Sequence, residues 1–426
     1  MLDMLVRNVN LSDGRKGVDI AIKEGKIVEI STGIKGHAIE EVDGRGYLAT
    51  PPFVDSHFHM DSALSLGEPR LNQSGTLLEG IEIWSELKPQ LTVDAIKKRA
   101  LEMCRWAIAR GTLAIRSHVD ISDDRLLAVE ALLEVRREMK PYIDLQLVAF
   151  PQDGYLRHPG SLDNMQRALA KGIDVIGGIP HFERTKSEGA RSIKLLCELA
   201  ADRGLLVDMH CDESDDPMSR HVETLAYETN RLGLHGRVTG SHLTSMHSMD
   251  NYYVSNLIPL MREADLKVVA NPLINITLQG RHDSYPVRRG MTRVKELMEA
   301  GMNVAFGHDC VMDPWYSLGS HDMLEVAHMG LHVGQMTGVE EMNQCFQAVT
   351  SNGARSLQLD GYGLEPGCKA DIVILQASST IDALRLRPER LFVIRSGKVI
   401  AKTEPATTSL LIEDHSGPVH FSRNLF

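Results

Sequence analysis

Eight short apolar runs alternate with segments of helical length between residues 47 and 307, and this alternation most constrains the fold. The runs expected to form strands cover residues 47–54, 113–119, 145–150, 175–178, 205–209, 238–241, 267–270 and 304–307. Helices are expected at 93–110, 124–139, 161–171, 192–203, 220–232 and 292–300. Strands that alternate with helices pair in parallel, and eight of them close into a barrel. The sequence therefore predicts a (β/α)₈ barrel over residues 49–362.

Both ends of the chain have a different pattern, with short segments of alternating apolar and polar residues separated by glycine. These segments are 4–9, 18–22 and 26–30 near the N-terminus, and 370–375, 391–396 and 398–402 near the C-terminus. A period of two residues is typical of half-buried strands. We expect residues 1–48 and 363–426 to form one small β-sandwich beside the barrel. The polar tail over 406–426 could wrap a partner or a neighbouring subunit.

Composition excludes several classes of protein. The net charge is −11, whereas nucleic-acid binding requires a basic face. The N-terminus lacks the apolar core of a signal peptide, and no run of about 18 apolar residues predicts a membrane span. The six cysteines contain no CxxC pair, so neither a zinc ribbon nor a redox motif is indicated. A cytoplasmic enzyme is the expected default.

Histidine and aspartate residues stand at the ends of four of the expected strands. The segments are His57-Phe58-His59, His210-Cys211-Asp212-Glu213, Ser241-His242 and His308-Asp309. Imidazole and carboxylate groups are ligands for hard or borderline divalent cations. A (β/α)₈ barrel gathers the carboxyl ends of its strands at one face, where its chemistry takes place. Together the four segments predict one metal site.

Several neighbours of these groups have candidate roles of their own. Glu213 is placed to act as the general acid or base of a metal-assisted hydrolysis. The alternative is that residues 211–213 belong to a solvated loop, as the following acidic residues suggest. Asp309 could bind the metal and accept a proton from water, whereas His308 is expected to point away. Asp55 could orient one of the ligand imidazoles.

The segments at the strand ends resemble those of the amidohydrolase superfamily, and the stretch EPGCKADIVIL (365–375) resembles its C-terminal return into the small β-domain. Longer stretches are similar to the cytosine deaminases of bacterial type. They are PPFVDSHFHMD (51–61), NQSGTLLEGIEIW (72–84), SHVDISD (117–123), DLQLVAFPQDG (144–154), IGGIPHFE (176–183), HCDE (210–213), NPLINITLQGRHDSYPVRRGMTRVKEL (271–297) and GHDCVMDPWYSLG (307–319). The resemblance covers nearly the whole predicted barrel.

This resemblance implies one divalent ion per chain, Fe²⁺ or Zn²⁺, held by His57, His59, His210 and Asp309. Binuclear relatives that open cyclic amides carry a lysine at the end of the fourth strand, which here reads VIGGIP. One HxH pair, one further histidine and one aspartate suffice for a single ion with an open position for water. A small pyrimidine substrate and a homo-oligomer are also expected.

Further roles follow from the resemblance by position. Gln152 would bind the amide edge of the substrate ring, and Glu213 would deliver a proton to a ring nitrogen. His242 would position or polarise the attacking water. Trp315 would close the pocket, and Leu77, or a neighbour between Gly75 and Gly80, would line it.

One residue departs from the family pattern. The family has a second aspartate after the metal-binding one, whereas this chain has His308-Asp309-Cys310. Cys310 is smaller and less polar, so its position predicts that 5-methylcytosine is accepted, and preferred over cytosine. The predicted function is metal-dependent hydrolytic deamination of a free aminopyrimidine with release of ammonia. The alternatives are a cyclic-amide hydrolase of the hydantoinase or dihydroorotase type, and a non-catalytic barrel that serves as an assembly protein.

Overall fold

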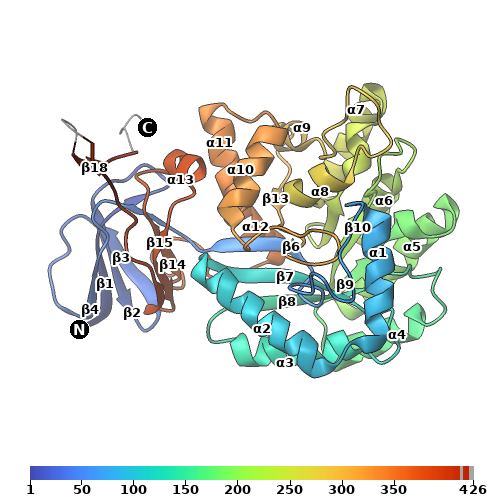
Figure 1. Ribbon diagram of the computed structural model, residues 1–426, viewed down its shortest axis with the longest axis horizontal. Helices are drawn as coiled ribbons and strands as arrows, with labels where there is room; N and C mark the ends of the chain where they lie inside the picture. The colour runs from blue at the N-terminus through green and yellow to red at the C-terminus, as the bar shows by residue number, and fades with distance from the viewer. Residues whose placement is uncertain (413–415, 422–426) are drawn as a thin grey trace.

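Eight parallel strands form a barrel in the computed structural model, which describes residues 1–412 and 416–421 (Figure 1). In sheet order they run without interruption from β6 to β13. Their bounds are β6 Phe53–Phe58, β7 Thr112–Asp120, β8 Asp144–Phe150, β9 Val175–Gly178, β10 Leu206–Cys211, β11 Val238–His242, β12 Lys267–Ala270 and β13 Val304–Phe306. The amide of His59 donates to the Asp309 carbonyl and the amide of Asp309 donates to the His57 carbonyl, both at 2.9 Å. These two bonds join the first strand to the end of the last, so the predicted barrel is confirmed.

The first predicted strand, 47–54, is wrong in one respect, because the structure divides it between two sheets. β5 (Leu48–Thr50) belongs to the terminal sheet, and β6 begins the barrel at Phe53. Pro51 and Pro52 lie between them. Proline has no amide hydrogen to donate to a strand ladder, so the pair separates the two strands.

Helices surround the barrel (Figure 1). They are α1 Leu77–Leu87, α2 Val93–Ala109, α3 Leu127–Met139, α4 Ser161–Lys171, α5 Lys186–Arg203, α6 His221–Leu232, α7 Asn251–Glu263, α8 Pro272–Leu278, α9 Val294–Glu299, α10 Met323–Val333, α11 Val339–Ala348, α12 Ser351–Leu357 and α13 Thr380–Leu386. On α2, the buried residues Ile96, Ala100, Met103 and Ala107 recur every three or four positions, and Thr92 caps the first turn. This spacing places one apolar stripe against the barrel. α1, α7, α8 and α10–α13 are not among the expected helices. In α1, Gly80 at the fourth position weakens the helical pattern.

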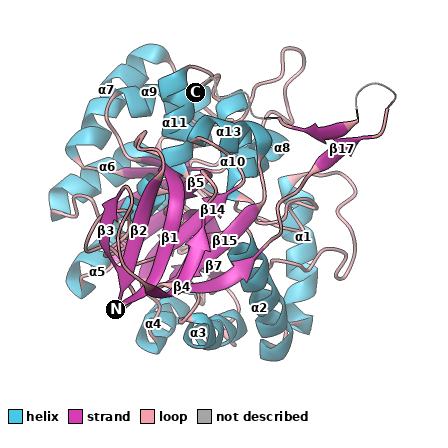
Figure 2. Ribbon diagram, turned by 90° about the vertical axis from the view of Figure 1, so that its left-hand side faces the viewer, coloured by secondary structure: helices cyan, strands magenta, loops and turns pink. Residues whose placement is uncertain are grey.

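The two ends of the chain share one sheet beside the barrel (Figure 2). Its strands are β1 Leu2–Leu11, β2 Val18–Lys23, β3 Lys26–Ser31, β4 Ala38–Asp43, β5, β14 Ile372–Leu375, β15 Arg390–Arg395 and β16 Lys398–Lys402. β5 joins the halves by pairing in parallel with β1 and antiparallel with β14. Val6, Ile20, Ile372 and Ile394 share one buried cluster, so both termini build one β-unit, as predicted.

The division at residues 48/49 and 362/363 stays a prediction. In the tail, β17 (Thr408–Leu410) pairs with β18 (Gly417–Val419). Two parts of the predicted partner-binding tail, 413–415 and 422–426, lie outside the described residues.

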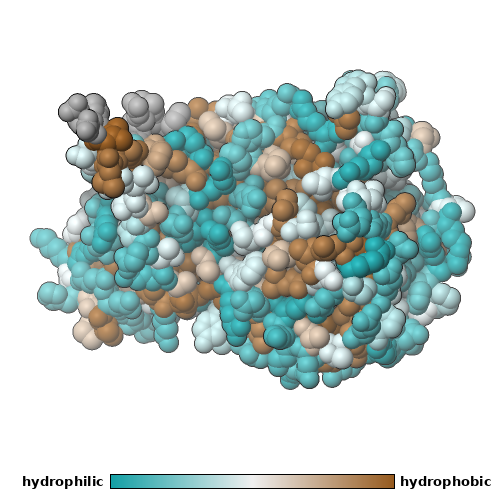
Figure 3. All heavy atoms as spheres, viewed as in Figure 1, coloured by the Kyte–Doolittle hydropathy of each residue, from teal (hydrophilic) through white to brown (hydrophobic). Residues whose placement is uncertain are grey.

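Within the described chain no helix combines the length and apolar character that a membrane span needs. Hydrophilic side chains cover much of the face shown in Figure 3.

Candidate active site

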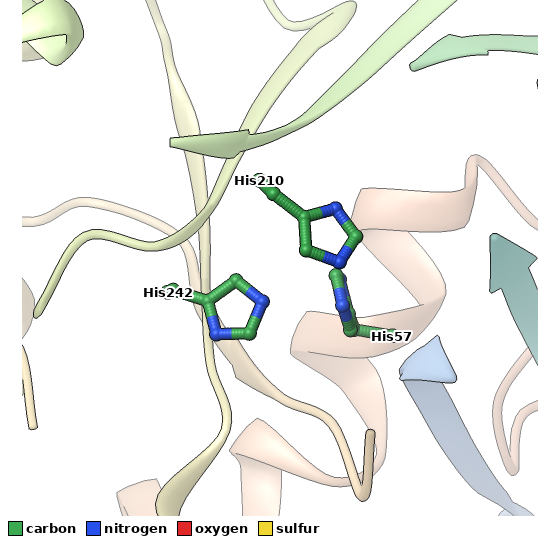
Figure 4. Close-up of side chains that lie close together, drawn as sticks. All are labelled: His57, His210 and His242. Atoms are coloured by element: carbon green, nitrogen blue, oxygen red, sulfur yellow. The ribbon is translucent and has the colours of Figure 1, made fainter. Parts of the chain in front are cut away.

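The carboxyl ends of β6, β10, β11 and β13 bring four histidines and one aspartate to one place. His59 Nε2 lies 3.0 Å from His210 Nε2 and 3.3 Å from Asp309 Oδ1. His57 Nε2 lies 3.7 Å from the same oxygen of Asp309, and His242 Nε2 lies 3.7 Å from its Oδ2. Figure 4 shows the rings of His57, His210 and His242 turned toward a common centre. The four predicted ligands therefore lie together, and His242 lies beside them.

The chemistry of this cluster fits a divalent metal. Burial lowers the pKa of His57 and His210 well below the usual value, and that of His59 to about 4, so these rings are neutral. Both ring nitrogens of His57 are buried and have no hydrogen-bond partner among the described residues. Neutral imidazoles with free lone pairs beside a carboxylate form the donor set that zinc or ferrous iron takes.

Backbone geometry at the strand ends supports this convergence. His242 and Asp309 adopt φ angles of 69° and 70°, in the left-handed region that residues other than glycine rarely occupy. Such strain is typical of functional sites, where the surrounding structure enforces it. A Cβ at Gly307 would lie 2.7 Å from the His57 carbonyl oxygen. Only glycine therefore lets the end of β13 approach β6 closely enough to place Asp309 beside the histidines.

Glu213 lies on the substrate side of the cluster. Its Oε1 is 3.4 Å from His242 Nδ1, which also faces the Asn275 amide at 3.0 Å. Burial raises the pKa of Glu213 to about 8, which favours a protonated carboxyl. With Asp309 on the other side of the His242 ring, one carboxyl is held at each nitrogen of that ring.

The alternative of a solvated loop over 211–213 is wrong. The side chain of Glu213 is 8% exposed, and Asp212 is fully buried. The Asp212 carboxylate accepts hydrogen bonds from Ser219 Oγ at 2.7 Å and from the amides of His221 and Val222 at 3.0 and 2.8 Å. The loop is therefore tied to the start of α6, and this anchors Glu213.

A cavity of about 410 Å³ opens above the cluster. Its lining includes His59, His210, His242, Asp309 and every other side chain for which a substrate or catalytic role was predicted: Leu77, Gln152, Glu213, Cys310 and Trp315. His57 lies beneath the floor and is fully buried. The lining also includes His181, from the short 3₁₀ segment Pro180–Phe182 after β9. His181 was missed, although it stands in the stretch IGGIPHFE (176–183) and Glu183 follows it two residues later.

Trp315 forms one wall of the cavity and depends on a glycine of α1. Its ring packs against Trp84 with centroids 5.9 Å apart, and Trp84 Nε1 donates to Asp120 at 2.9 Å. A Cβ at Gly80 would lie 2.4 Å from Cδ1 of Trp315. The position of Trp315 therefore requires glycine at this point of the helix.

Gly80→Ala is expected to displace Trp315 and raise KM about 10-fold with little change in kcat, the effect of about 1.4 kcal/mol of lost binding. Alanine is the better helix former, so the helix itself should not weaken. Steady-state kinetics measure the effect, with Ser85→Ala on the exposed face of α1 as the control. An unchanged KM would show that Trp315 does not contact the substrate.

Two predictions about neighbouring residues can be compared with the structure. His308 points away from the cluster as predicted, since its ring packs against Phe58 and His321 and its Nδ1 lies 2.9 Å from the Cys310 carbonyl oxygen. The prediction for Asp55 is wrong in its detail. Its Oδ1 accepts from the amides of His57 and His308 at 3.2 and 3.0 Å. It therefore positions the backbone of the ligand segments. The imidazole that it contacts belongs to His321, whose Nε2 lies 3.1 Å from Asp55 Oδ2, and not to a predicted ligand.

The fold and this cluster define a metal-dependent hydrolase built on a (β/α)₈ barrel, and comparison with known proteins specifies which. A family model described as the amidohydrolase family matches residues 40–405, and the chain belongs to that family. The crystal structure of 5-methylcytosine deaminase from Klebsiella pneumoniae liganded with 5-fluorocytosine is 42% identical, with a TM-score of 0.92. The matched region covers 95% of this chain and 98% of the chain in that crystal structure.

Two curated relatives act on other compounds by name. The N-isopropylammelide isopropyl amidohydrolase of Pseudomonas sp. (strain ADP) is 31% identical over 409 residues, 94% of this chain and 98% of the relative. The pterin deaminase of Rhizobium rhizogenes is 28% identical over 400 residues, 92% of this chain and 90% of the relative. The chain is therefore an amidohydrolase by family, while the relatives are named for different compounds.

The purified protein is expected to hold about one divalent ion per chain, because the converging ligands suffice for one ion and not for two. Elemental analysis of the protein as isolated, and after chelation and reloading with iron or zinc, measures this stoichiometry. Two tightly held ions per chain, both required for turnover, would contradict the mononuclear assignment.

Proposed function

We propose that the protein hydrolytically deaminates a free aminopyrimidine, converting 5-methylcytosine to thymine and cytosine to uracil, with release of ammonia. The observation that carries the proposal is the arrangement of Glu213 and Asp309 on opposite sides of His242, 3.4 and 3.7 Å from its ring nitrogens. A proton donor and a proton acceptor thus stand on either side of the imidazole that would orient the attacking water. The similarity to a 5-methylcytosine deaminase supports this reaction.

The ion would be held by His57, His59, His210 and Asp309, and Fe²⁺ and Zn²⁺ both suit these donors. When bound, such an ion lowers the pKa of a water molecule toward ~7. The chain's own residues then have to bind the base, orient the water and move protons.

Each of these steps has a residue in place. His242 orients the attacking water, and Asp309 accepts its proton. Glu213, whose burial favours the protonated form, donates a proton to the ring nitrogen next to the reacting carbon. The exocyclic amine takes the proton held by Asp309 and leaves as ammonia, and the second proton of the attacking water restores Glu213. Gln152 pairs with the amide edge of the ring, and Leu77 and Trp315 bound the cavity around it.

Cys310 bears on the choice of substrate. It lines the cavity, is 4% exposed, and its Sγ lies 3.6 Å from Asp309 Oδ1. Burial raises the pKa of this thiol well above its usual value, so the side chain is uncharged. A methyl group at C5 of the pyrimidine would desolvate a carboxylate without pairing it, whereas a buried thiol behaves as a small apolar group. We therefore propose that 5-methylcytosine is preferred over cytosine.

The cavity favours one second candidate, a larger aminated heterocycle such as a pterin. At about 410 Å³ it falls in the range of about 300–1,000 Å³ that is typical of sites for drug-sized ligands. The relative named as a pterin deaminase supports this candidate. Cyclic-amide hydrolysis is less favoured, because β9 reads VIGG and carries no lysine. The filled ligand positions speak against a non-catalytic assembly protein.

An ammonia-release screen of the metal-loaded enzyme over pyrimidines, triazines and pterins tests the proposal. Ammonia from cytosine or 5-methylcytosine, well above that from the other rings, is the expected result. Release from pterins alone would favour the second candidate, and ring opening without ammonia would favour a cyclic-amide hydrolase.

A further inference from the structure

A buried polar cluster lies inside the barrel, one layer below the residues that meet at the metal site. Arg116 and His118 stand two positions apart on β7, as Asp208 and His210 do on β10. Residues two apart on a strand point to the same face, so Arg116 and Asp208 form a deeper layer of the barrel interior. His118 and Asp208 are fully buried, and Arg116 is 1% exposed.

The charges of this deeper layer are paired within it. Arg116 Nη1 donates to Asp208 Oδ2 at 2.8 Å, and Ser241 Oγ donates to Asp208 Oδ1 at 2.7 Å. The other arms of the guanidinium donate to Gln146 at 2.7 Å and to the Ser356 carbonyl at 2.8 Å. A buried ion pair persists when its remaining donors and acceptors are satisfied in this way. Asp208 is therefore a fixed negative group that already has its cation.

His118 occupies the space between Asp208 and the metal ligand His57. The rings of His118 and His57 lie with centroids 4.1 Å apart and planes inclined by 38°. His118 Nε2 lies 3.8 Å from Asp208 Oδ1. One nitrogen of each ring and one oxygen of Asp208 lie within 4.8 Å of one another. Among the described residues, none forms a hydrogen bond with the ring nitrogens of His57 or His118.

We propose that His118 and Asp208 form a positioning unit that holds the ring of His57 from inside the barrel and thereby determines the metal affinity. Asp208 holds an oxygen 3.8 Å from Nε2 of His118, and His118, which does not line the cavity, packs against His57. Neither residue touches the substrate. Removing a group that orients a metal-ligating histidine typically costs about 10–100-fold in metal affinity.

This arrangement could also be taken for a second ion site, because His57, His118 and Asp208 are all possible ligands. Arg116 opposes that assignment, since a divalent cation there would face a guanidinium 2.8 Å from the carboxylate it needs. The inference rests on the metal site of the proposed function and not on the identity of the substrate.

The test measures Zn²⁺ affinity by competition with a chelator, and the visible absorption spectrum of the Co²⁺-loaded protein. We expect His118→Phe to weaken Zn²⁺ binding about 10–100-fold and to change the Co²⁺ bands. His118→Gln, which keeps a polar amide, should recover part of the affinity. Met103→Ala, which removes a buried side chain from α2, is the control and should leave affinity and spectrum unchanged.

If His118→Phe fails to fold, Ser241→Ala is tested in its place. Ser241→Ala removes one hydrogen bond to Asp208 and leaves Arg116 paired with it, and a weaker Zn²⁺ affinity is again expected. Native affinity and spectrum in these variants would overturn the proposal. So would two ions per native chain with one lost in His118→Phe, since His118 would then be a ligand. A native protein that binds the ion but releases no ammonia would refute the deaminase function and leave this inference standing.

Discussion

Glu213→Gln is expected to retain the metal and to lose about 10²-fold or more of kcat, the usual scale for general acid–base catalysis. Glutamine keeps the shape of the side chain and a polar end near His242, but its amide is too weak an acid to transfer a proton to the ring nitrogen. The expected loss is in kcat, because Glu213 acts on the reacting ring and is not among the proposed metal ligands. Steady-state kinetics with 5-methylcytosine and metal analysis of the same preparation measure both effects.

The control is Glu223→Gln, on α6 outside the cavity, where the carboxylate accepts a hydrogen bond from the Tyr253 hydroxyl at 2.8 Å. It should retain nearly all activity. Near-normal turnover in Glu213→Gln would assign the proton transfer to another group. Loss of the ion from this variant would make Glu213 a ligand, and the proposed division of roles would have to change.

The second large effect is expected at Cys310. In the native protein the ratio of kcat/KM for 5-methylcytosine to that for cytosine should exceed one, and Cys310→Asp should lower it about 10–200-fold, the discrimination that one methyl group provides in an apolar pocket. The introduced carboxylate would be desolvated by the methyl group without gaining a partner. Cys310→Ala, which is small and uncharged, is the matched variant and should keep the native preference.

The two kinetic constants for each base must be measured in all three proteins, at equal metal content. A native ratio below one that Cys310→Asp leaves unmoved would show that Cys310 is only a buried small residue. A fall in activity on both bases by the same factor would show that the introduced charge disturbs Asp309 and not the methyl pocket.

The sequence allowed the barrel and most of the candidate site to be predicted for a common physical reason. The ligands stand at the ends of apolar runs, and a parallel barrel brings those ends together. The expected strand at 175–178 has the bounds that the structure shows, and helix α4 was also predicted with its observed bounds. The HxH spacing alone predicted that His57 and His59, at the end of β6, share one face.

What the sequence could not predict depends on contacts between distant segments. The role of Gly80 follows from the position of Trp315, more than 200 residues later, and that of Gly307 from the His57 carbonyl. In the sequence, nothing distinguishes His118 and Asp208 from other residues of barrel strands. Their position is evident only from the contact between the rings of His118 and His57. The division of residues 47–54 is the exception, because Pro51-Pro52 marks it in the sequence itself.

The measurement that tests the central claim most directly is product analysis of the metal-loaded native enzyme with 5-methylcytosine. The account predicts one ammonia and one thymine for each molecule of substrate consumed, with a higher kcat/KM than for cytosine. Consumption of neither base by protein that holds its ion, or a ring-opened product without ammonia, would contradict it.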